Sequence, residues 1–152
     1  AVAGLLLSYR NIAFKKNIYI HYYISDSLKE VPCKLSELNT ILGNLILNSI
    51  EAVEFLDDDE KHIHVTIGRS KSEYFFEVNN FTNALEFEKN ITKIFKHGYS
   101  SKNNFDNQGQ GLSIVHTIVE KYDGYIYPKL LDDTVTFVVK IPFRNTNAQI
   151  NT

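Results

Sequence analysis

The sequence predicts a two-layer α/β sandwich, with helices collected on one side of a β-sheet. Two observations support this prediction. Two pairs of neighbouring strand-like segments can each close as a hairpin, and three longer segments have apolar residues every three or four positions, as helices do. Hairpins and helices that each have one apolar face can bury those faces by packing on each other as two layers.

The N-terminal half contains two of the three helical patterns. Apolar side chains recur at helical spacing over residues 1–16, and Asn17 can end that helix. Residues 18–24 are aromatic and β-branched, which favours a strand. The longest helical pattern covers residues 34–55, and residues 57–61 predict a charged turn after it.

The middle of the chain combines a hairpin with a polar segment. Residues 62–69 and 73–78 alternate between apolar and polar, and so predict two antiparallel strands. Residues 79–85 are polar and irregular, and a short helix is expected over residues 86–95. Residues 96–110 have few aliphatic side chains and many glycines, asparagines and serines, so we expect a mobile loop there.

The C-terminal part supplies the third helix and the second hairpin. The helix is expected over residues 112–122, and Gly124 follows its end. Residues 125–130 and 134–142 predict the two strands of the closing hairpin.

Composition limits the class of protein. One domain is expected over residues 1–143, followed by a polar, disordered tail over residues 144–152. A net charge of -2 gives no basic field for nucleic acid, and the single cysteine, Cys33, indicates a reducing compartment. No run approaches the roughly 20 apolar residues of a membrane helix. The chain contains no methionine and is expected to be a piece of a longer parent, which could still carry a membrane anchor.

The long helix carries a polar stripe. Four residues follow one another at seven, four and three positions and so share one face, next to apolar neighbours: Glu37, Asn44, Asn48 and Glu51. One interpretation is a solvated stripe on an amphipathic helix. The other is a wall of oxygen ligands that faces a metal–phosphate group, because Mg²⁺ prefers oxygen ligands.

Two further segments fit a phosphate site. Gly109 and Gly111 open the predicted third helix directly before Leu112, so that a ligand can approach backbone amides that attract anions. An ordinary turn is the alternative. Upstream, Phe95 and Tyr99 could anchor a lid from which Lys102 reaches phosphate, or the segment could be a loop with solvated lysines.

The order and spacing of these segments resemble a known family. Residues 44–52 resemble the asparagine box of histidine-kinase and gyrase-type (GHKL) ATPases. Residues 94–102 are similar to the phenylalanine box of sensor kinases, and residues 109–115 to their second glycine box. The chain is therefore identified as resembling the ATP-binding catalytic domain of a bacterial sensor histidine kinase.

This resemblance implies a Bergerat-type sandwich, with a mixed, mostly antiparallel sheet covered on one face by about three helices. It implies ATP and Mg²⁺ as cofactors, Asn48 as the Mg²⁺ ligand, and Asn44 beside the phosphates. Gly109, Gly111 and Leu112 would bind phosphate together with Lys102. Gyrase-like ATPases have a glutamate that activates water where Asn44 stands, and asparagine cannot act as a base, which fits a kinase.

The first glycine box departs from the family pattern. Residues 79–85 contain neither the aspartate that reads adenine nor a glycine. Asn80, with Asn79 as the alternative, takes the aspartate position, and its oxygen could accept a hydrogen bond from adenine without charge assistance. The same asparagine, together with the sequence of residues 98–102, resembles the Gram-positive peptide-pheromone quorum-sensing kinases.

The resemblance also implies partners that lie outside this chain. The γ-phosphate would pass to a histidine on a dimerisation helix, and then to a response regulator. None of the five histidines has a phosphoacceptor setting, so the isolated chain is expected not to label itself. The parent is expected to be a membrane-anchored homodimer with this domain in the cytoplasm. The alternatives are a degenerate scaffold that no longer uses ATP and, less in keeping with Asn44, a serine kinase of the anti-sigma type.

Two other groups of residues are given no role from the sequence. His62 and His64 share one face of a strand at a spacing that could bind metal, but no third ligand is evident, and solvated histidines are the preferred interpretation. The acidic residues 57–60 are interpreted as a solvated turn rather than a metal site.

Overall fold

The computed structural model of the chain describes residues 2–25, 28, 30–83 and 107–143. Within these ranges, three α-helices, a short 3-10 helix and five strands follow one another along the chain. They are α1 (Val2–Phe14), β1 (Tyr19–Ile24), α2 (Leu35–Val53), η1 (Asp58–Glu60), β2 (His62–Arg69), β3 (Glu73–Phe81), α4 (Asn107–Lys121), β4 (Tyr125–Leu131) and β5 (Thr134–Pro142).

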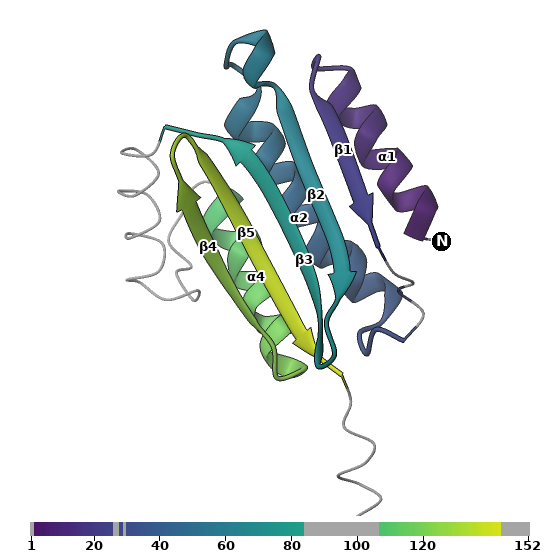
Figure 1. The fold of residues 1–152 in the computed structure, drawn as a ribbon. Helices are drawn as coiled ribbons and strands as arrows, with labels where there is room; N and C mark the ends of the chain where they lie inside the picture. The colour runs from purple at the N-terminus through teal and green to yellow at the C-terminus, as the bar shows by residue number, and fades with distance from the viewer. Residues whose placement is uncertain (1, 26–27, 29, 84–106, 144–152) are drawn as a thin grey trace, which may run out of the picture.

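The five strands form one mixed sheet in the order β1-β2-β3-β5-β4. β1 runs parallel to β2, and the other neighbours are antiparallel. The three helices lie on one face of this sheet, with α2 against the central strands and α4 beside it (Figure 1). The predicted two-layer α/β sandwich with a mixed, mostly antiparallel sheet is confirmed.

The hydrophobic core lies between the two layers. In β3, four side chains that point toward the helices are buried, and those between them are half-buried. The apolar residues of α2 that face the sheet are also almost fully buried, so this helix forms the centre of the core. The largest buried side chains of β3 and α2 include Tyr74, Phe76, Leu38, Ile41, Leu42, Leu45 and Ile46.

Two helices end in left-handed residues. Asn17 has φ 60°, and the amide of Ile18 donates to the carbonyl of Ala13 at 3.0 Å, so Asn17 ends α1 as predicted. At the end of α4 the left-handed residue is Asp123, not Gly124. Gly124 serves a different need, because a Cβ atom there would lie 2.2 Å from the carbonyl oxygen of Lys140.

Two element boundaries differ from the predictions by more than two residues. β3 continues through Phe81, because Asn79 and Asn80 pair with β5 and β2 instead of forming a loop. α4 begins at Asn107, five residues before the predicted start. The helix therefore includes Asn107, Gly109 and Gly111, although asparagine and glycine disfavour helices. The predicted short helix over residues 86–95, most of the predicted loop and the tail over residues 144–152 lie outside the described residues.

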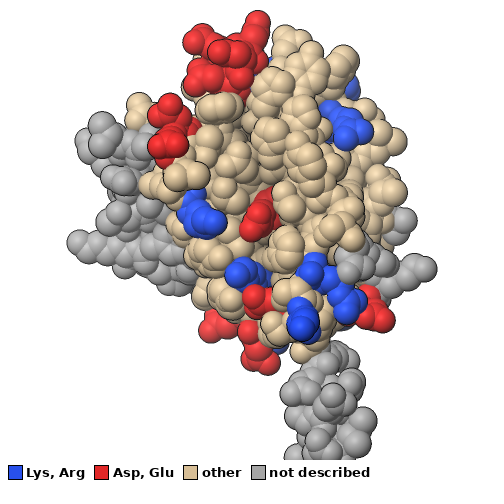
Figure 2. Space-filling model, viewed as in Figure 1, with Lys and Arg blue, Asp and Glu red and all other residues tan. Residues whose placement is uncertain are grey.

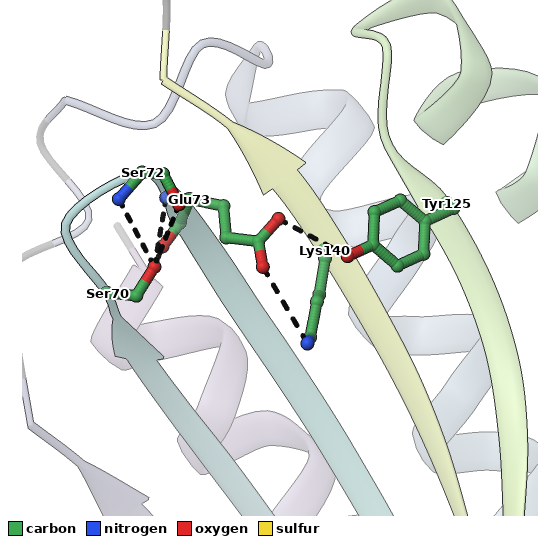
Figure 3. Close-up of polar contacts among 5 residues, drawn as sticks. All are labelled: Ser70, Ser72, Glu73, Tyr125 and Lys140. Atoms are coloured by element: carbon green, nitrogen blue, oxygen red, sulfur yellow. Dashed lines mark hydrogen bonds and ion pairs between the residues drawn. The ribbon is translucent and has the colours of Figure 1, made fainter.

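Polar contacts tie the hairpin end of β3 to the far edge of the sheet (Figure 3). The Ser70 hydroxyl accepts hydrogen bonds from the amides of Ser72 at 3.3 Å and Glu73 at 3.2 Å, which closes the β2–β3 turn. The Glu73 carboxylate lies 3.7 Å from Lys140 on β5 and accepts a 3.5 Å hydrogen bond from Tyr125 on β4.

In the described part of the chain, no helix has the length and apolar character needed to cross a membrane.

Candidate functional site

The polar stripe of α2 faces α4, and two contacts fix how these helices pair. Near the start of α2, Glu37 accepts a 2.8 Å hydrogen bond from Lys121 at the end of α4. Two turns further along α2, Asn44 lies against Gly111, near the start of α4. The helices therefore run antiparallel, and the second half of α2 approaches the N-terminal end of α4.

Asn44 and Gly111 are in close contact. A Cβ atom added at Gly111 would lie 2.7 Å from Oδ1 of Asn44, so only glycine leaves room for the asparagine. The other end of the Asn44 amide donates to the carbonyl of Thr40 at 2.7 Å, which fixes the direction of its oxygen toward α4. The structure thus brings together two predicted site residues that are 67 positions apart in the sequence.

Asn48 lies one helical turn beyond Asn44, in the direction of the start of α4 in this antiparallel pair. Its side chain is half-buried, and no hydrogen bond within the described residues engages it. α4 has no acidic residue in its first turn, where the backbone amides of a helix are unpaired and carry partial positive charge. A half-buried amide beside a helix N-terminus suits a cation that is bound together with an anion.

Asn80 forms the buried polar part of the site together with Ser49. Both side chains are 2% exposed, and they are the two buried polar side chains of the described residues. Ser49 donates from its hydroxyl to Oδ1 of Asn80 at 2.8 Å, and Asn80 donates to the carbonyl of Phe81 at 2.8 Å. Asn79, the alternative to Asn80, points to the other face of the sheet and donates to Thr136 at 2.9 Å.

Ser49 was missed because its position in the sequence lies on the apolar side of α2. A lone hydroxyl among leucines, directly after Asn48, was the available indication that a polar partner faces it across the core. The carbonyl oxygen of Asn80 has two lone pairs, and Ser49 uses one of them. The arrangement therefore leaves acceptor capacity on Asn80.

Glu37 belongs to the polar stripe but not to the polar cluster around Asn44. Its carboxylate accepts hydrogen bonds from Lys121, from the Tyr122 hydroxyl and from the backbone amide of Lys34. The Lys121 hydrogen bond is the main reason, followed by those of Tyr122 and Lys34, that the pKa of Glu37 falls from 4.5 to about 2. All its bonds are made within the protein, so the interpretation of the stripe as one continuous wall of ligands is wrong at Glu37.

The second glycine segment is only partly described. Gly109 lies in the first turn of α4, and Lys102 with the predicted lid lies outside the described residues. Leu112 is 2% exposed, and its side chain is part of the hydrophobic core, so only its backbone could face a ligand. The roles predicted for Gly109, Leu112 and Lys102 toward phosphate stay predictions.

The chemistry of this region is that of a neutral polar cradle. It combines the amide side chains of Asn44 and Asn48, the N-terminal end of α4 and the buried Ser49–Asn80 pair. Among the described residues, no hydrogen bond or ion pair joins Asn44 or Asn48 to a carboxylate or an imidazole. The cradle can therefore hold a cation and an anion, but it places no general base against them.

Comparison with known proteins finds the same architecture. Residues 33–142 match the protein family described as "GHKL domain". The probable C4-dicarboxylate sensor kinase of Halalkalibacterium halodurans is 32% identical over 108 residues, which are 70% of this chain and 20% of that protein. The chain thus spans about a fifth of the length of this relative.

Solved structures agree in fold. The nucleotide-free catalytic domain of the histidine kinase ThkA has a TM-score of 0.72 at 21% identity, covering 93% of this chain and 91% of that chain. Full-length ShkA in complex with AMPPNP has a TM-score of 0.68 at 20% identity, covering 94% of this chain and 30% of that chain.

Proposed function

The chain belongs to the GHKL domain family and has the fold of a histidine kinase catalytic domain, and on this premise we propose that the α2–α4 cradle binds Mg²⁺·ATP. GHKL domains bind ATP. In the parent sensor kinase, the γ-phosphate would pass to a histidine on a dimerisation helix outside this chain.

The observation that carries the proposal is the contact between Asn44 and Gly111, with Asn48 one turn away. Asn48 would ligate Mg²⁺ through its amide oxygen, and the N-terminal end of α4 with Gly109 and Gly111 would hold the phosphates. Bound Mg²⁺ would supply charge neutralisation of the phosphates. These residues fit the cofactor because they offer oxygen ligands and unpaired amides, and no acidic side chain stands in the first turn of α4.

The residues present favour transfer over hydrolysis. Asn44 donates one amide hydrogen to Thr40 and presents its oxygen toward α4, and an amide cannot accept a proton at neutral pH. Water near the phosphates would therefore find no base at this position. A kinase domain that keeps its γ-phosphate until a histidine arrives needs this property.

Adenine recognition would use the Ser49–Asn80 pair. Oδ1 of Asn80 accepts from Ser49 and can accept a second hydrogen bond, which the exocyclic amine of adenine would donate. A neutral acceptor forms a hydrogen bond about half as strong as a carboxylate does. We therefore expect weak binding, with a dissociation constant between tens of micromolar and about a millimolar, or roughly -4 to -6 kcal/mol.

The parent protein is proposed to be a membrane-anchored homodimer that keeps this domain in the cytoplasm and signals to a response regulator. Its subtype is a separate proposal. Asn80 in the place of the family's aspartate supports the peptide-pheromone kinases, whereas the H. halodurans relative has the name of a C4-dicarboxylate sensor kinase. If a C4-dicarboxylate such as succinate changed the autophosphorylation rate of the parent kinase, the peptide-pheromone proposal would be wrong.

Calorimetric titration of the chain with Mg²⁺ and a non-hydrolysable ATP analogue tests nucleotide binding. We expect binding in the range given above, and a weaker signal when EDTA removes Mg²⁺. A parallel incubation with γ-labelled ATP should leave the chain unlabelled and the ATP intact. Absence of both heat and thermal shift at several millimolar nucleotide would contradict the proposal and leave the scaffold alternative, which membership in the family does not favour.

A further inference from the structure

A second cluster of chemically active side chains lies on the face of the sheet that the helices leave uncovered. His21 on β1 pairs in register with His64 on β2, and Tyr19 pairs with His62. The helix-facing positions of β2 are buried apolar residues, so the alternating histidines point to the opposite face. The parallel pairing of β1 and β2 therefore places three imidazoles side by side, and it supplies the third histidine that the sequence alone did not reveal.

The imidazole ring of His21 stacks against those of His62 and His64. Nε2 of His21 lies 2.9 Å from Nδ1 of His62, and the two ring centroids are 5.2 Å apart. On its other side, the His21 ring centroid lies 4.8 Å from that of His64. The planes of neighbouring rings differ by only 14° and 17°. His21 is thus the central member of the group.

The contact between His21 and His62 requires at least one neutral imidazole. At 2.9 Å, one of the two facing nitrogens of His21 and His62 must donate and the other must accept, which two protonated rings could not do. Neutral imidazole is also the form that binds metal ions.

We propose that His21, His62 and His64 form a binding site for a divalent transition-metal ion, with Zn²⁺ as the preferred ion. Three imidazoles with water as the fourth ligand are an established donor set for zinc, and imidazole also suits Ni²⁺ and Cu²⁺. The site is separate from the nucleotide cradle, which lies on the helix-covered side of the sheet.

One of the three pairs of histidines has its nitrogens close to the separation that a metal needs. Two nitrogens bound to one tetrahedral zinc at about 2.05 Å are about 3.3 Å apart, so His21 and His62 need to separate by only a few tenths of an ångström. The three histidines do not bring one nitrogen each within 4.8 Å of one another, because His62 and His64 stack on opposite sides of His21. Their side chains must therefore also rotate toward a common point to bind one ion. All three histidines are half-buried and not packed in the core, which leaves this rotation open.

Two tyrosines provide the surrounding contacts. The Tyr23 hydroxyl lies 3.3 Å from Nδ1 of His64, and engaging this nitrogen leaves Nε2 of His64 for a metal. The Tyr19 ring stacks on His62 at a centroid distance of 5.5 Å. Hydrogen bonds to the second nitrogen of a histidine commonly orient metal-binding imidazoles. The order across the two strands is Tyr19, His62, His21, His64, Tyr23.

The acidic group around η1 does not form an alternative site by itself. Asp57, Asp59 and Glu60 could bring three carboxylate oxygens within 4.8 Å of one another, but two of these residues are exposed and carboxylates in such clusters are commonly solvated. Figure 2 shows the uncovered face of the sheet as mostly uncharged surface, with a group of acidic residues at one end and mixed acidic and basic residues at the other. This charge would attract cations toward the start of β2 without supplying the nitrogen ligands.

The test is a titration of the full chain, free of any histidine tag, with ZnCl₂ and separately with CoCl₂. We expect one ion per chain, visible absorption from tetrahedral Co²⁺, and a higher melting temperature with Zn²⁺, because the ion would link edge strand β1 to β2. His21→Gln, His62→Gln and His64→Gln should each weaken binding at least about tenfold. His116→Gln on α4 is the matched control and should bind as the unchanged chain does.

Three results would overturn the proposal. One is the absence of binding at about 1 mM Zn²⁺, which is roughly the weakest affinity of interest. Another is binding that the three histidine variants leave unchanged, and the third is binding that Asp59→Asn abolishes instead. Melting temperatures of all variants in EDTA show whether they remain folded, and titration with Mg²⁺ and the ATP analogue should give the same affinity in His64→Gln as in the unchanged chain.

Discussion

The two ends of the α2–α4 helix pair have opposite chemical character. At one end, the Glu37 carboxylate is surrounded by donors of the protein itself: Lys121, Tyr122 and the amide of Lys34. At the other end, the Asn44 amide directs its oxygen toward α4. Both ends lie on one polar stripe of α2, and Glu37 and Asn44 are seven positions apart.

The difference shows how one helix face serves both stability and binding. A charged group with all its hydrogen bonds made inside the protein holds the helices together and has little to offer a ligand. A partly unpaired neutral amide carries a smaller free-energy penalty than a partly unpaired carboxylate. The amides at the other end can therefore remain without all their hydrogen bonds until a ligand binds. The predictions that follow test this division, beginning with the largest expected effect.

Asn48→Ala should abolish Mg²⁺-dependent nucleotide binding, with an affinity loss of about 100-fold or more, equivalent to roughly 3 kcal/mol. The substitution removes the proposed oxygen ligand, while alanine is favourable in a helix and leaves α2 intact. Calorimetric titration measures the affinity, and thermal unfolding measures the stability.

The two measurements separate two roles for Asn48. A near-native melting temperature with lost binding supports the nucleotide site. A buried structural amide would behave differently, because its loss would leave partners unsatisfied and cost about 1–3 kcal/mol of stability. Lowered stability with binding unchanged would therefore make Asn48 structural.

Gly111→Ala should disturb the cradle by steric overlap. Its Cβ atom would meet Oδ1 of Asn44 at 2.7 Å, and because neighbouring residues must move, we expect a loss of about 1–3 kcal/mol in unfolding free energy and weaker nucleotide binding. Gly4→Ala is the matched control, since nothing lies within 4 Å of a Cβ atom at that position in α1. It should be neutral or stabilise by roughly 0.5–1 kcal/mol. Equal behaviour of the two variants in thermal unfolding would show that Gly111 has no special packing role.

The two layers of the fold could be predicted from the sequence, because the apolar periodicity that distinguishes helices from strands is a local property. The strands at residues 62–69 and 134–142 match the structure to the residue, since their alternation and turns are encoded within each hairpin. β3 was cut short at Val78, because Asn79 and Asn80 disfavour strands by propensity and are held there only by pairing with β2 and β5. Propensity was overridden by tertiary contacts.

The residue types of the site could be predicted from the sequence. Which residues of the polar stripe pair within the protein, and which remain for a ligand, could not. The spacing of Glu37, Asn44 and Asn48 placed them on one face, but no spacing shows that Lys121, 84 residues away, pairs with Glu37. Ser49 and the His21–His62 contact were equally hidden, because each depends on which strand or helix lies opposite. Long-range pairing is the part of the site that periodicity cannot supply.

Glu37→Gln should lower the melting temperature by a few degrees at neutral pH and leave nucleotide binding unchanged. Because folding lowers the pKa of Glu37 from 4.5 to about 2, its contribution to stability is fully present above pH 4.5 and is lost as the pH falls toward 2. The difference in stability between the unchanged chain and the variant should therefore shrink over that range. Glu51→Gln, at an exposed glutamate on the same helix, is the control and should have the melting temperature of the unchanged chain at neutral pH.

Asn80→Asp should change nucleotide affinity far less than Asn48→Ala does, and its two consequences have opposite sign. The added charge would strengthen the hydrogen bond proposed to adenine, which corresponds to about fivefold tighter binding if the bond gains roughly 1 kcal/mol. The same charge would be buried beside Ser49, whose single hydroxyl hydrogen compensates only part of the lost hydration, so the nucleotide-free protein should melt at a lower temperature.

Asn79→Asp provides the matched comparison, because this neighbour lies on the other face of the sheet and bonds to Thr136. It should leave nucleotide affinity unchanged. Calorimetric titration of both variants with Mg²⁺ and the ATP analogue distinguishes the two faces. Tighter binding confined to Asn80→Asp would place adenine at the Ser49–Asn80 pair. An affinity that neither variant changes, or that both change equally, would mean that adenine is recognised elsewhere and that the buried pair only stabilises the contact between α2 and β3.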